Sequence, residues 1–240
     1  MVKKKSNRRE KQKLPASAAV EPPRRGRPRQ YDPERALIKA SEVFWARGYA
    51  GTSLDDLAAA TGMNRPSLYA AFGDKRDLYL KTLERYQQQS RAASFQLLAD
   101  SPTLRVFLTR FYDVALKLYR AGEAEARGCY SISTAPAQAA SDPAVRTFLA
   151  QSICGTDAFL AEVIGKARDR GEIAGSTDPL ALAQVATATL HTLAVRSRVG
   201  VPRRELKALA AAAVDMICGK AGPPPIGSVH KRNRKGQGGG

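Results

Sequence analysis

Two side chains four residues apart, Arg65 and Tyr69, offer the clearest chemistry in this 240-residue sequence. An arginine can donate two parallel hydrogen bonds to O6 and N7 of a guanine, and residues at i and i+4 share one face of a helix. Leu68 and Phe72 have the same spacing on a different face, so they can pack inward. The spacing predicts a short helix whose outer edge can read base pairs in a DNA major groove.

Residues around this helix complete a candidate DNA-contacting surface. Asn64 can cap the helix, and backbone N–H groups at the N-termini of the flanking helices can bind phosphates. The contacts predicted from this segment are Thr52, Asn64, Arg65, Pro66, Ser67, Tyr69 and Lys75. The alternative is that these are ordinary surface residues of a helical bundle. It is the better interpretation for any one residue alone, whereas their joint spacing favours a DNA-binding unit.

Four helical segments must position these side chains. Apolar residues at helical spacing, together with capping and glycine signals, predict where they lie. They cover residues 34–47, Thr52 to Gly62, Asn64 to Gly73, and Asp74 onward through Tyr86. Two short helices that are joined by a tight glycine turn and packed on a third helix form a helix-turn-helix.

Four more helices are predicted downstream, and no stretch of sequence shows the apolar–polar alternation of a strand. They cover residues 103–121, 142–170, 178–199 and 202–218. The predicted inward face of the first of them consists of Leu104, Phe107, Leu108, Phe111, Ala115 and Leu118. The predicted fold class is therefore all-α, with an N-terminal three-helix unit followed by a larger helical part.

Basic charge is concentrated at the two ends of the chain. Of a formal net charge of +17, residues 1–30 hold 11 Lys and Arg against two acids, and residues 220–240 hold five basic residues and no acid. Both segments are predicted to be disordered because they have little to bury. Nucleic acid is the expected partner, and a solubilising tail or, less well, a membrane surface is the alternative. Arg27 and Arg29 could enter a minor groove beside the first helix.

The inventory of reactive side chains argues against an enzyme. There are two histidines, no glycine-rich phosphate loop and no recognisable pair of carboxylates. The three cysteines are widely spaced without a CxxC pair, so neither a disulfide framework, a zinc site nor another cofactor is expected, and a reducing cytoplasm fits. No long apolar run predicts a membrane span or an export signal. A rival interpretation is an architectural protein that binds DNA without sequence preference.

From Tyr31 to about Tyr86 the chain resembles the N-terminal domain of the TetR family of repressors. The stretch GYAGTSLDDLAAATGMNRPSLYAAFGDKRDLY has the family's Thr, Leu-Ala, Gly, Leu-Tyr, Phe, Gly and Lys in order. The resemblance implies DNA contacts at Thr52, Arg65, Pro66, Ser67, Tyr69 and Lys75. Many members have an aromatic residue or histidine where Ala70 and Ala71 stand, so the base-reading surface is smaller here and the basic arm could compensate.

The resemblance also implies how the whole chain is organised. A DNA-binding domain would occupy residues 31–77 and a ligand-sensing, dimerising domain residues 78–219, between a basic arm (1–30) and a basic tail (220–240). Residues 179–218 would pair with their copies in a four-helix bundle, and packing within one subunit is the alternative. Small residues that permit close approach there are Ala208, Ala211 and Ala212. The implied function is a homodimeric repressor that a small-molecule ligand releases from a palindromic double-stranded operator.

A ligand cavity would be lined mainly by apolar and aromatic side chains. The aromatic candidates are Phe107, Phe111, Tyr112, Tyr119, Tyr130, Phe148 and Phe159, although core packing is the favoured interpretation of each. His191 is more readily an internal or interface histidine than a ligand anchor. Cys129 lies in a segment that resembles the start of the family's sixth helix. It is interpreted as inert and buried, with a redox-sensitive thiol as the alternative.

Overall fold

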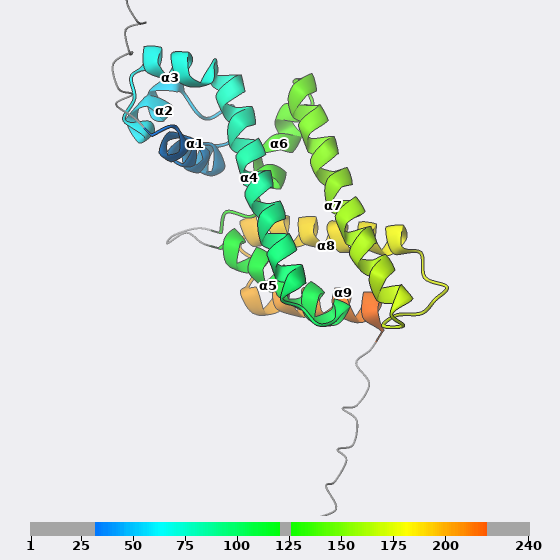
Figure 1. Cartoon of the computed structure of the whole chain (residues 1–240). Coiled ribbons are helices and arrows are strands. Elements are labelled where there is room, and N and C mark those ends of the chain that lie inside the picture. The colour runs from blue at the N-terminus through cyan, green and yellow to red at the C-terminus, as the bar shows by residue number, and fades with distance from the viewer. Residues whose placement is uncertain (1–31, 121–125, 220–240) are drawn as a thin grey trace, which may run out of the picture. The chain divides into compact units, whose positions relative to one another are not determined.

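The computed structural model describes residues 32–120 and 126–219, which form nine α-helices and no strand (Figure 1). The helices are α1 (Pro33–Arg47), α2 (Leu54–Thr61), α3 (Arg65–Phe72), α4 (Lys75–Ala99), α5 (Leu104–Tyr119), α6 (Tyr130–Ala139), α7 (Pro143–Asp169), α8 (Pro179–Arg198) and α9 (Arg203–Cys218). The predicted all-α class is confirmed for these residues. The basic arm with Arg27 and Arg29, and the basic tail, lie outside the described residues.

Local side-chain caps and one glycine shape the helix-turn-helix. Ser53 and Asp56 cap α2 reciprocally, and Asn64 Oδ1 accepts a hydrogen bond from the Ser67 amide at 2.9 Å at the start of α3. Gly62 follows α2 with φ 71° and ψ 15°, a left-handed conformation that a side chain would strain. This turn carries the chain directly from α2 into α3, as the sequence predicted.

The first hydrophobic core, here called the N-terminal core, joins α1–α4 to α6 and the start of α7. Its buried residues are Ala36, Ala40, Phe44, Leu57, Met63, Leu68, Phe72, Leu78, Tyr79, Leu83, Tyr130, Ala135, Ala139, Val145 and Phe148. The helix-turn-helix therefore packs on later helices of the chain as well as on α1.

The second, here called the C-terminal core, lies among α5, α7, α8 and α9. Its buried residues are Leu104, Phe107, Leu108, Tyr112, Leu116, Tyr119, Leu160, Val163, Ile164, Ala167, Ala183, Ala186, Leu193, Ala194, Leu206, Ala210, Val214 and Ile217. None of the helices in residues 32–120 and 126–219 is both long enough and apolar enough to cross a bilayer.

The prediction of which α5 residues face the core is partly wrong. The residues that are buried are Leu104, Phe107, Leu108, Tyr112, Leu116 and Tyr119. Leu118 is 38% exposed, and Phe111 and Ala115 are only partly buried. The reason is that α5 carries apolar residues around much of its circumference. The stripe that packs on α8 and α9 is buried, whereas Phe111, Ala115 and Leu118 border a cavity.

Candidate nucleic-acid interface and ligand cavity

The α3 helix has one packed face and one face in solvent. Leu68 is 2% exposed and Phe72 5% exposed, whereas Tyr69 is 48% exposed and the Arg65 side chain 55% exposed. Asn64 and Pro66 are exposed as well, and Ser67 is half-buried. The division between the two faces is the one that the four-residue spacing predicted.

Asp55 of α2 holds the guanidinium of Arg65. Nε of Arg65 donates to Oδ1 at 2.8 Å and Nη2 donates to Oδ2 at 2.5 Å, so one edge of the guanidinium is engaged in a bidentate pair. Both side chains are largely exposed, and such a pair contributes only about 0–1 kcal/mol in water. This ion pair can therefore be broken at small cost. Asp55 was not among the residues predicted from the sequence, although an acid in the first turn of the preceding helix was a signal for it.

Thr52 was predicted to contact a phosphate, but its side chain points into the protein. The residue is 2% exposed, and its Oγ1 donates to the Gly48 carbonyl oxygen at 2.7 Å. Its side chain therefore supports the turn before α2. A phosphate contact through this side chain stays a prediction, which the burial disfavours.

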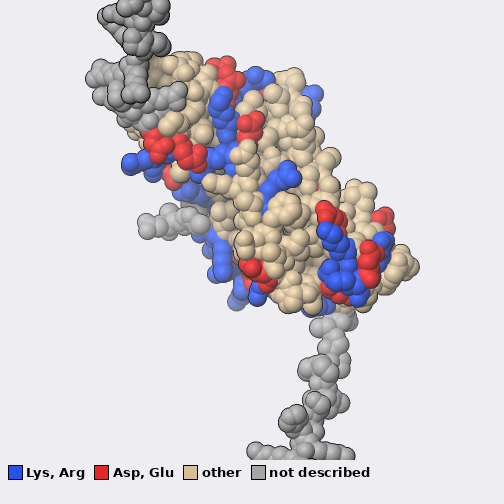
Figure 2. Space-filling view, in the orientation of Figure 1, with Lys and Arg blue, Asp and Glu red and all other residues tan. Residues whose placement is uncertain are grey.

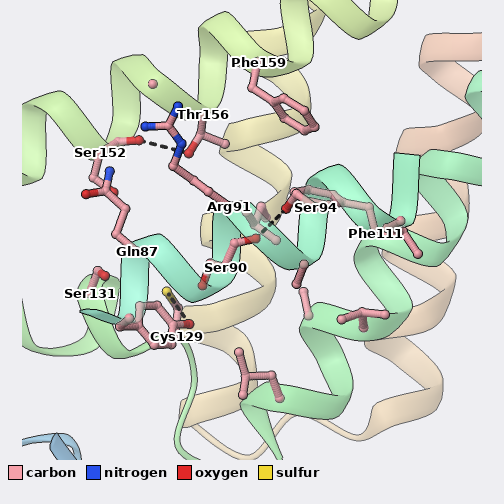
Figure 3. A pocket seen from close by; sticks show the side chains of 18 of the residues that line it. Gln87, Ser90, Arg91, Ser94, Phe111, Cys129, Ser131, Ser152, Thr156 and Phe159 are labelled. Atoms are coloured by element: carbon pink, nitrogen blue, oxygen red, sulfur yellow. Dashed lines mark hydrogen bonds between the residues drawn. The ribbon is translucent and has the colours of Figure 1, made fainter. Parts of the chain in front are cut away.

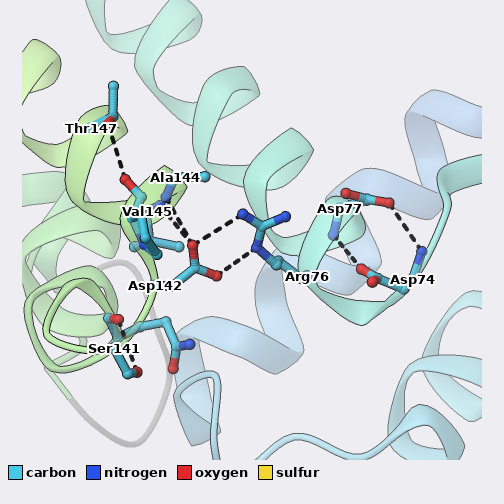
Figure 4. Close-up of polar contacts among 10 residues, drawn as sticks. Asp74, Arg76, Asp77, Ser141, Asp142, Ala144, Val145 and Thr147 are labelled. Carbon is cyan, nitrogen blue, oxygen red and sulfur yellow. Dashed lines mark hydrogen bonds and ion pairs between the residues drawn. The ribbon is translucent and has the colours of Figure 1, made fainter.

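Lys75 begins α4 beside an aromatic ring. Its Nζ lies 4.4 Å from the centroid of the Tyr49 ring, a cation–π contact, and partial burial lowers the pKa of Lys75. Asp74 and Asp77 cap the same helix end reciprocally (Figure 4). The ring thus restrains a cation at the helix end where a phosphate contact was predicted.

The next residue, Arg76, connects this helix end to α7 (Figure 4). Its Nε donates to Oδ2 of Asp142 at 2.6 Å and its Nη2 donates to Oδ1 at 3.2 Å. Asp142 is only 7% exposed and also accepts from the amides of Ala144 and Val145 at the start of α7. The hydrogen bonds from Arg76 lower the pKa of Asp142. One carboxylate therefore caps α7 and anchors the first turn of α4.

A cavity of about 410 Å³ lies between α4, α5, α7 and α8 (Figure 3). Its size falls within the range of roughly 300–1,000 Å³ that is usual for small organic ligands. Of the seven aromatic candidates, Phe111, Tyr119 and Phe159 line it, and the other four belong to the two cores. Its uncharged polar lining includes Gln87, Ser90, Ser94, Ser131, Ser152 and Thr156.

His191 and Cys129 also line this cavity. Burial lowers the pKa of His191, so its imidazole is neutral near pH 7. Burial raises the pKa of the Cys129 thiol, whose sulfur lies 3.5 Å from the Tyr86 hydroxyl. A reactive thiolate requires a lowered pKa, so the structure supports an inert Cys129.

Two family models and a close relative in sequence decide where this protein belongs. Residues 37–82 match the bacterial regulatory proteins, tetR family, and residues 106–213 match the tetracyclin repressor-like C-terminal domain. The uncharacterized HTH-type transcriptional regulator YezE of Bacillus subtilis is 36% identical over 161 residues, which cover 66% of this chain and 82% of YezE. The chain belongs to the TetR family. It is a helix-turn-helix transcriptional regulator, as the resemblance implied.

Other TetR-type proteins extend the comparison. The HTH-type transcriptional repressor ComR of Escherichia coli is 28% identical over 187 residues, which cover 78% of this chain and 89% of ComR. A solved structure of the TetR family regulator CifR, a cysteine mutant complexed with 26-bp double-strand operator DNA, is 31% identical. It superposes with a TM-score of 0.70 over 78% of this chain and 98% of the CifR chain.

Two features of this TetR-family chain were not predicted from its sequence. The ion pair between Arg76 and Asp142 joins residues 66 positions apart, so local spacing gave no signal for it. The polar side of the cavity did have a signal, because Gln87, Ser90 and Ser94 recur at helical spacing along α4.

Proposed function

We propose that this TetR-family regulator is a homodimeric repressor of a palindromic double-stranded operator, and that a small molecule in the cavity releases it. The exposed outer face of α3 carries the proposal, because Arg65 and Tyr69 face solvent while Leu68 anchors the helix from behind. The major groove admits one such helix. A dimer would place two of them about one DNA turn apart, ~34 Å.

Each predicted contact except the buried Thr52 has a part in this proposal. Arg65 exchanges Asp55 for a guanine, and Lys75 binds a phosphate beside the N-terminus of α4. The remaining direct contacts at α3 are Asn64, Pro66, Ser67 and Tyr69. Arg27 and Arg29 would reach the adjacent minor groove.

Exposed apolar residues support dimerisation through α8 and α9. Those with large side chains are Leu180, Val185, Val195, Val199 and Met216, of which Val199 and Met216 are 74% and 76% exposed. The small residues Ala208, Ala211 and Ala212 are also exposed on α9. Apolar surface of this kind marks an interaction site, and small residues let helices of two subunits approach closely.

The proposed DNA-binding domain covers residues 31–77 and the ligand-sensing, dimerising domain residues 78–219. Their boundary falls inside α4, which supports a coupling role for that helix. Tyr79 of α4 lies in the N-terminal core, and two turns later Gln87 and Ser90 line the cavity. A ligand that prefers one position of α4 would shift the spacing of the two recognition helices.

We also infer that the chain has no catalytic activity and works in the cytoplasm. A repressor of this type acts by occupying DNA, so it needs no reacting groups. Its operator lies in the compartment that holds the chromosome. The comparison with operator-bound CifR supports both inferences.

Selection of bound DNA from a random pool with the full-length chain tests the proposal. We expect palindromic sites whose half-sites are about 10 bp apart. Arg65→Ala should relax base preference at one position per half-site by about 1–3 kcal/mol, whereas Lys75→Ala should weaken all sequences alike. Recovery of no preferred sequence would instead identify an architectural DNA-binding protein.

Asp55→Asn tests the exchange at Arg65 directly. Removing the carboxylate frees the guanidinium and takes a negative charge away from the DNA, so operator affinity should rise by roughly threefold to tenfold. The same substitution in an Arg65→Ala background is the control. The gain in operator affinity should be smaller in that background, because only the loss of repulsion between Asp55 and the DNA remains. Equal gains in both backgrounds would contradict the proposed exchange.

A further inference from the structure

Arg91 gives the cavity a charge of its own. Its side chain extends from α4 toward Ser152 and Thr156 of α7 (Figure 3). Among residues 32–120 and 126–219, Arg91 has no acidic partner within ion-pair distance. A guanidinium has five N–H donors in a planar fork that fits a carboxylate. Arg91 is therefore free to bind an anionic group that enters the cavity.

Neutral donors lie on the same side as Arg91. Gln87, one turn before Arg91 on α4, and Ser152 of α7 line the cavity with it (Figure 3). An amide NH₂ has two donors and a serine hydroxyl has one. They add hydrogen bonds for an oxyanion without adding a competing negative charge.

The other titratable groups in the lining supply little negative charge that would attract a cation to the region of Arg91. Asp100 is the C-cap of α4, nine residues after Arg91 and about 13 Å away along the helix axis. Its Oδ2 already accepts a hydrogen bond from Nε2 of Gln96 at 3.2 Å. His191 is neutral near pH 7 because burial lowers its pKa. Asp157 adjoins the lining and acts on His191, but it makes no ion pair with Arg91. No other charged side chain of the lining lies near Arg91.

Much of the remaining wall is apolar and aromatic. The ring centroids of Phe95 and Phe159 are 5.0 Å apart, and Phe111 and Leu118 of α5 also line the cavity. Figure 2 shows few charged side chains over the middle of α4 and α7 in that view. Such a wall binds a hydrocarbon or aromatic body by removing it from water.

We propose that the effector is an amphipathic organic monocarboxylate. Its acid group pairs with Arg91, and its apolar body lies among Phe95, Phe111 and Phe159. The release of operator by this ligand rests on the proposed repressor function, whereas its binding does not.

The single tryptophan of the chain provides a readout that needs no DNA. The rings of Trp45 and Tyr86 have centroids 5.6 Å apart, and Tyr86 lines the cavity. Nε1 of Trp45 donates to the Arg127 carbonyl oxygen at 3.2 Å. A ligand that moves Tyr86 should change the fluorescence of Trp45.

The test is a panel of alkanoates and phenylalkanoates with about six to twelve carbons, set against amides and amines of equal length. Binding to the full-length chain is measured by calorimetry and by Trp45 fluorescence. At least one acid should bind about 10-fold more tightly than its amide, and no amine should bind more tightly than its acid. Arg91→Gln should abolish the preference for acid over amide. Arg120→Gln, which removes an exposed charge outside the cavity, should keep it.

A second variant tests the location. Gly155 of α7 lines the cavity, and a Cβ added there would meet nothing within 4 Å. Gly155→Leu should place an isobutyl group in part of the cavity and weaken binding of the acids. Gly155→Ala adds one methyl group to the same backbone position and should retain most of it.

Equal binding of acids and amides, tighter binding of amines, or no binding by any acid would overturn the proposed ligand class. A preference for acid that survives Arg91→Gln would overturn the role of Arg91. Gel shifts with the selected operator, made on the same preparations, report separately on the repressor function. Acids that bind without releasing operator would contradict the proposed release and leave the ligand class intact.

Discussion

Both cores are packed with apolar side chains, but the N-terminal core also contains hydroxyl pairs that join separate helices. In the N-terminal core, buried hydroxyls pair directly across helices: Tyr79 with Thr134 and Tyr130 with Thr82, each at 2.7 Å. Burial raises the pKa of Tyr79 to about 12, so its hydroxyl stays protonated and able to donate. Hydrogen bonds are directional, and these therefore fix how α4 faces α6.

The C-terminal core relies on close apolar packing. Tyr112 donates its hydroxyl proton to the Ala186 carbonyl oxygen at 3.1 Å, but two other buried hydroxyls, those of Thr187 and Ser197, have no partner within the described residues. Such packing is not directional and supplies stability in proportion to buried area. The comparison indicates that the C-terminal core stabilises the fold and the N-terminal core sets the orientation of the helix-turn-helix.

Leu108→Ala should have the largest effect on stability. Leu108 is fully buried on α5, and its truncation should lower the free energy of unfolding by about 2–5 kcal/mol. Urea denaturation measures the loss, and gel shifts measure operator affinity under conditions where the variant is folded. Operator affinity should be unchanged, so a parallel loss of affinity would break the proposed division between the cores.

Asp142→Asn should have the next largest effect, about 1–3 kcal/mol at pH 7. Asparagine still caps a helix, so the change isolates the ion pair with Arg76. Because Arg76 lowers the pKa of Asp142, the contribution is present above the ordinary value of 3.8 and is lost as pH falls through the lowered pKa. Urea midpoints of wild type and variant should differ at neutral pH and converge only as the pH falls through the lowered pKa of Asp142. A difference between the two urea midpoints that persists in acid would contradict the stabilising role of the charge on Asp142.

Local signals in the sequence predicted most of the elements of the fold. The caps Asn64, Asp74, Asp142 and Asp178 each mark the start of a helix in the structure. The extent of α6 was missed, because this short helix has Pro136 inside it and no side-chain cap. Its start was suggested only by the resemblance at Cys129.

The exposure of site residues could be predicted from the sequence where those residues lie on a single helix. The exposure of Arg65 and Tyr69 followed from spacing alone. The partner Asp55, the burial of Thr52 and the anchor Asp142 depend on how separate segments meet, which periodicity does not determine.

The large apolar residues that are exposed to solvent fall into three groups, one at each proposed site. The exposed large apolar residues of the described part are Tyr69 on α3, Phe95, Val114 and Leu118 at the cavity, and Leu180, Val185, Val195, Val199 and Met216 on or beside α8 and α9. Each group belongs to one proposed contact, with DNA, with ligand or with a second subunit. Exposed apolar surface is costly, so its restriction to three places supports these assignments.

A matched pair of hydroxyl deletions sharpens the comparison of the cores. Tyr79→Phe and Tyr112→Phe should each cost about 1 kcal/mol, because each removes one buried hydrogen bond. Thr134 keeps its bond to the Tyr130 carbonyl oxygen, so no buried donor is left alone. Only Tyr79→Phe should reduce the effect of ligand on operator affinity, which gel shifts with and without an acid effector measure. Equal coupling in the two variants would contradict an orienting role for the N-terminal core.

The smallest expected effect is a gain of stability at a position between the cavity and solvent. Gly155→Ala should raise the free energy of unfolding by about 0.5–1 kcal/mol, because alanine loses less backbone entropy in a helix and the added Cβ meets open space. Gly128→Ala should act in the opposite direction. Gly128 has φ +66°, and its Cβ would lie 2.7 Å from the Ala194 carbonyl oxygen. Thermal unfolding of the two variants should move the midpoint up for Gly155 and down for Gly128. A loss at both positions would mean that the wall of the cavity near Gly155 is packed more tightly than the open space around this residue indicates.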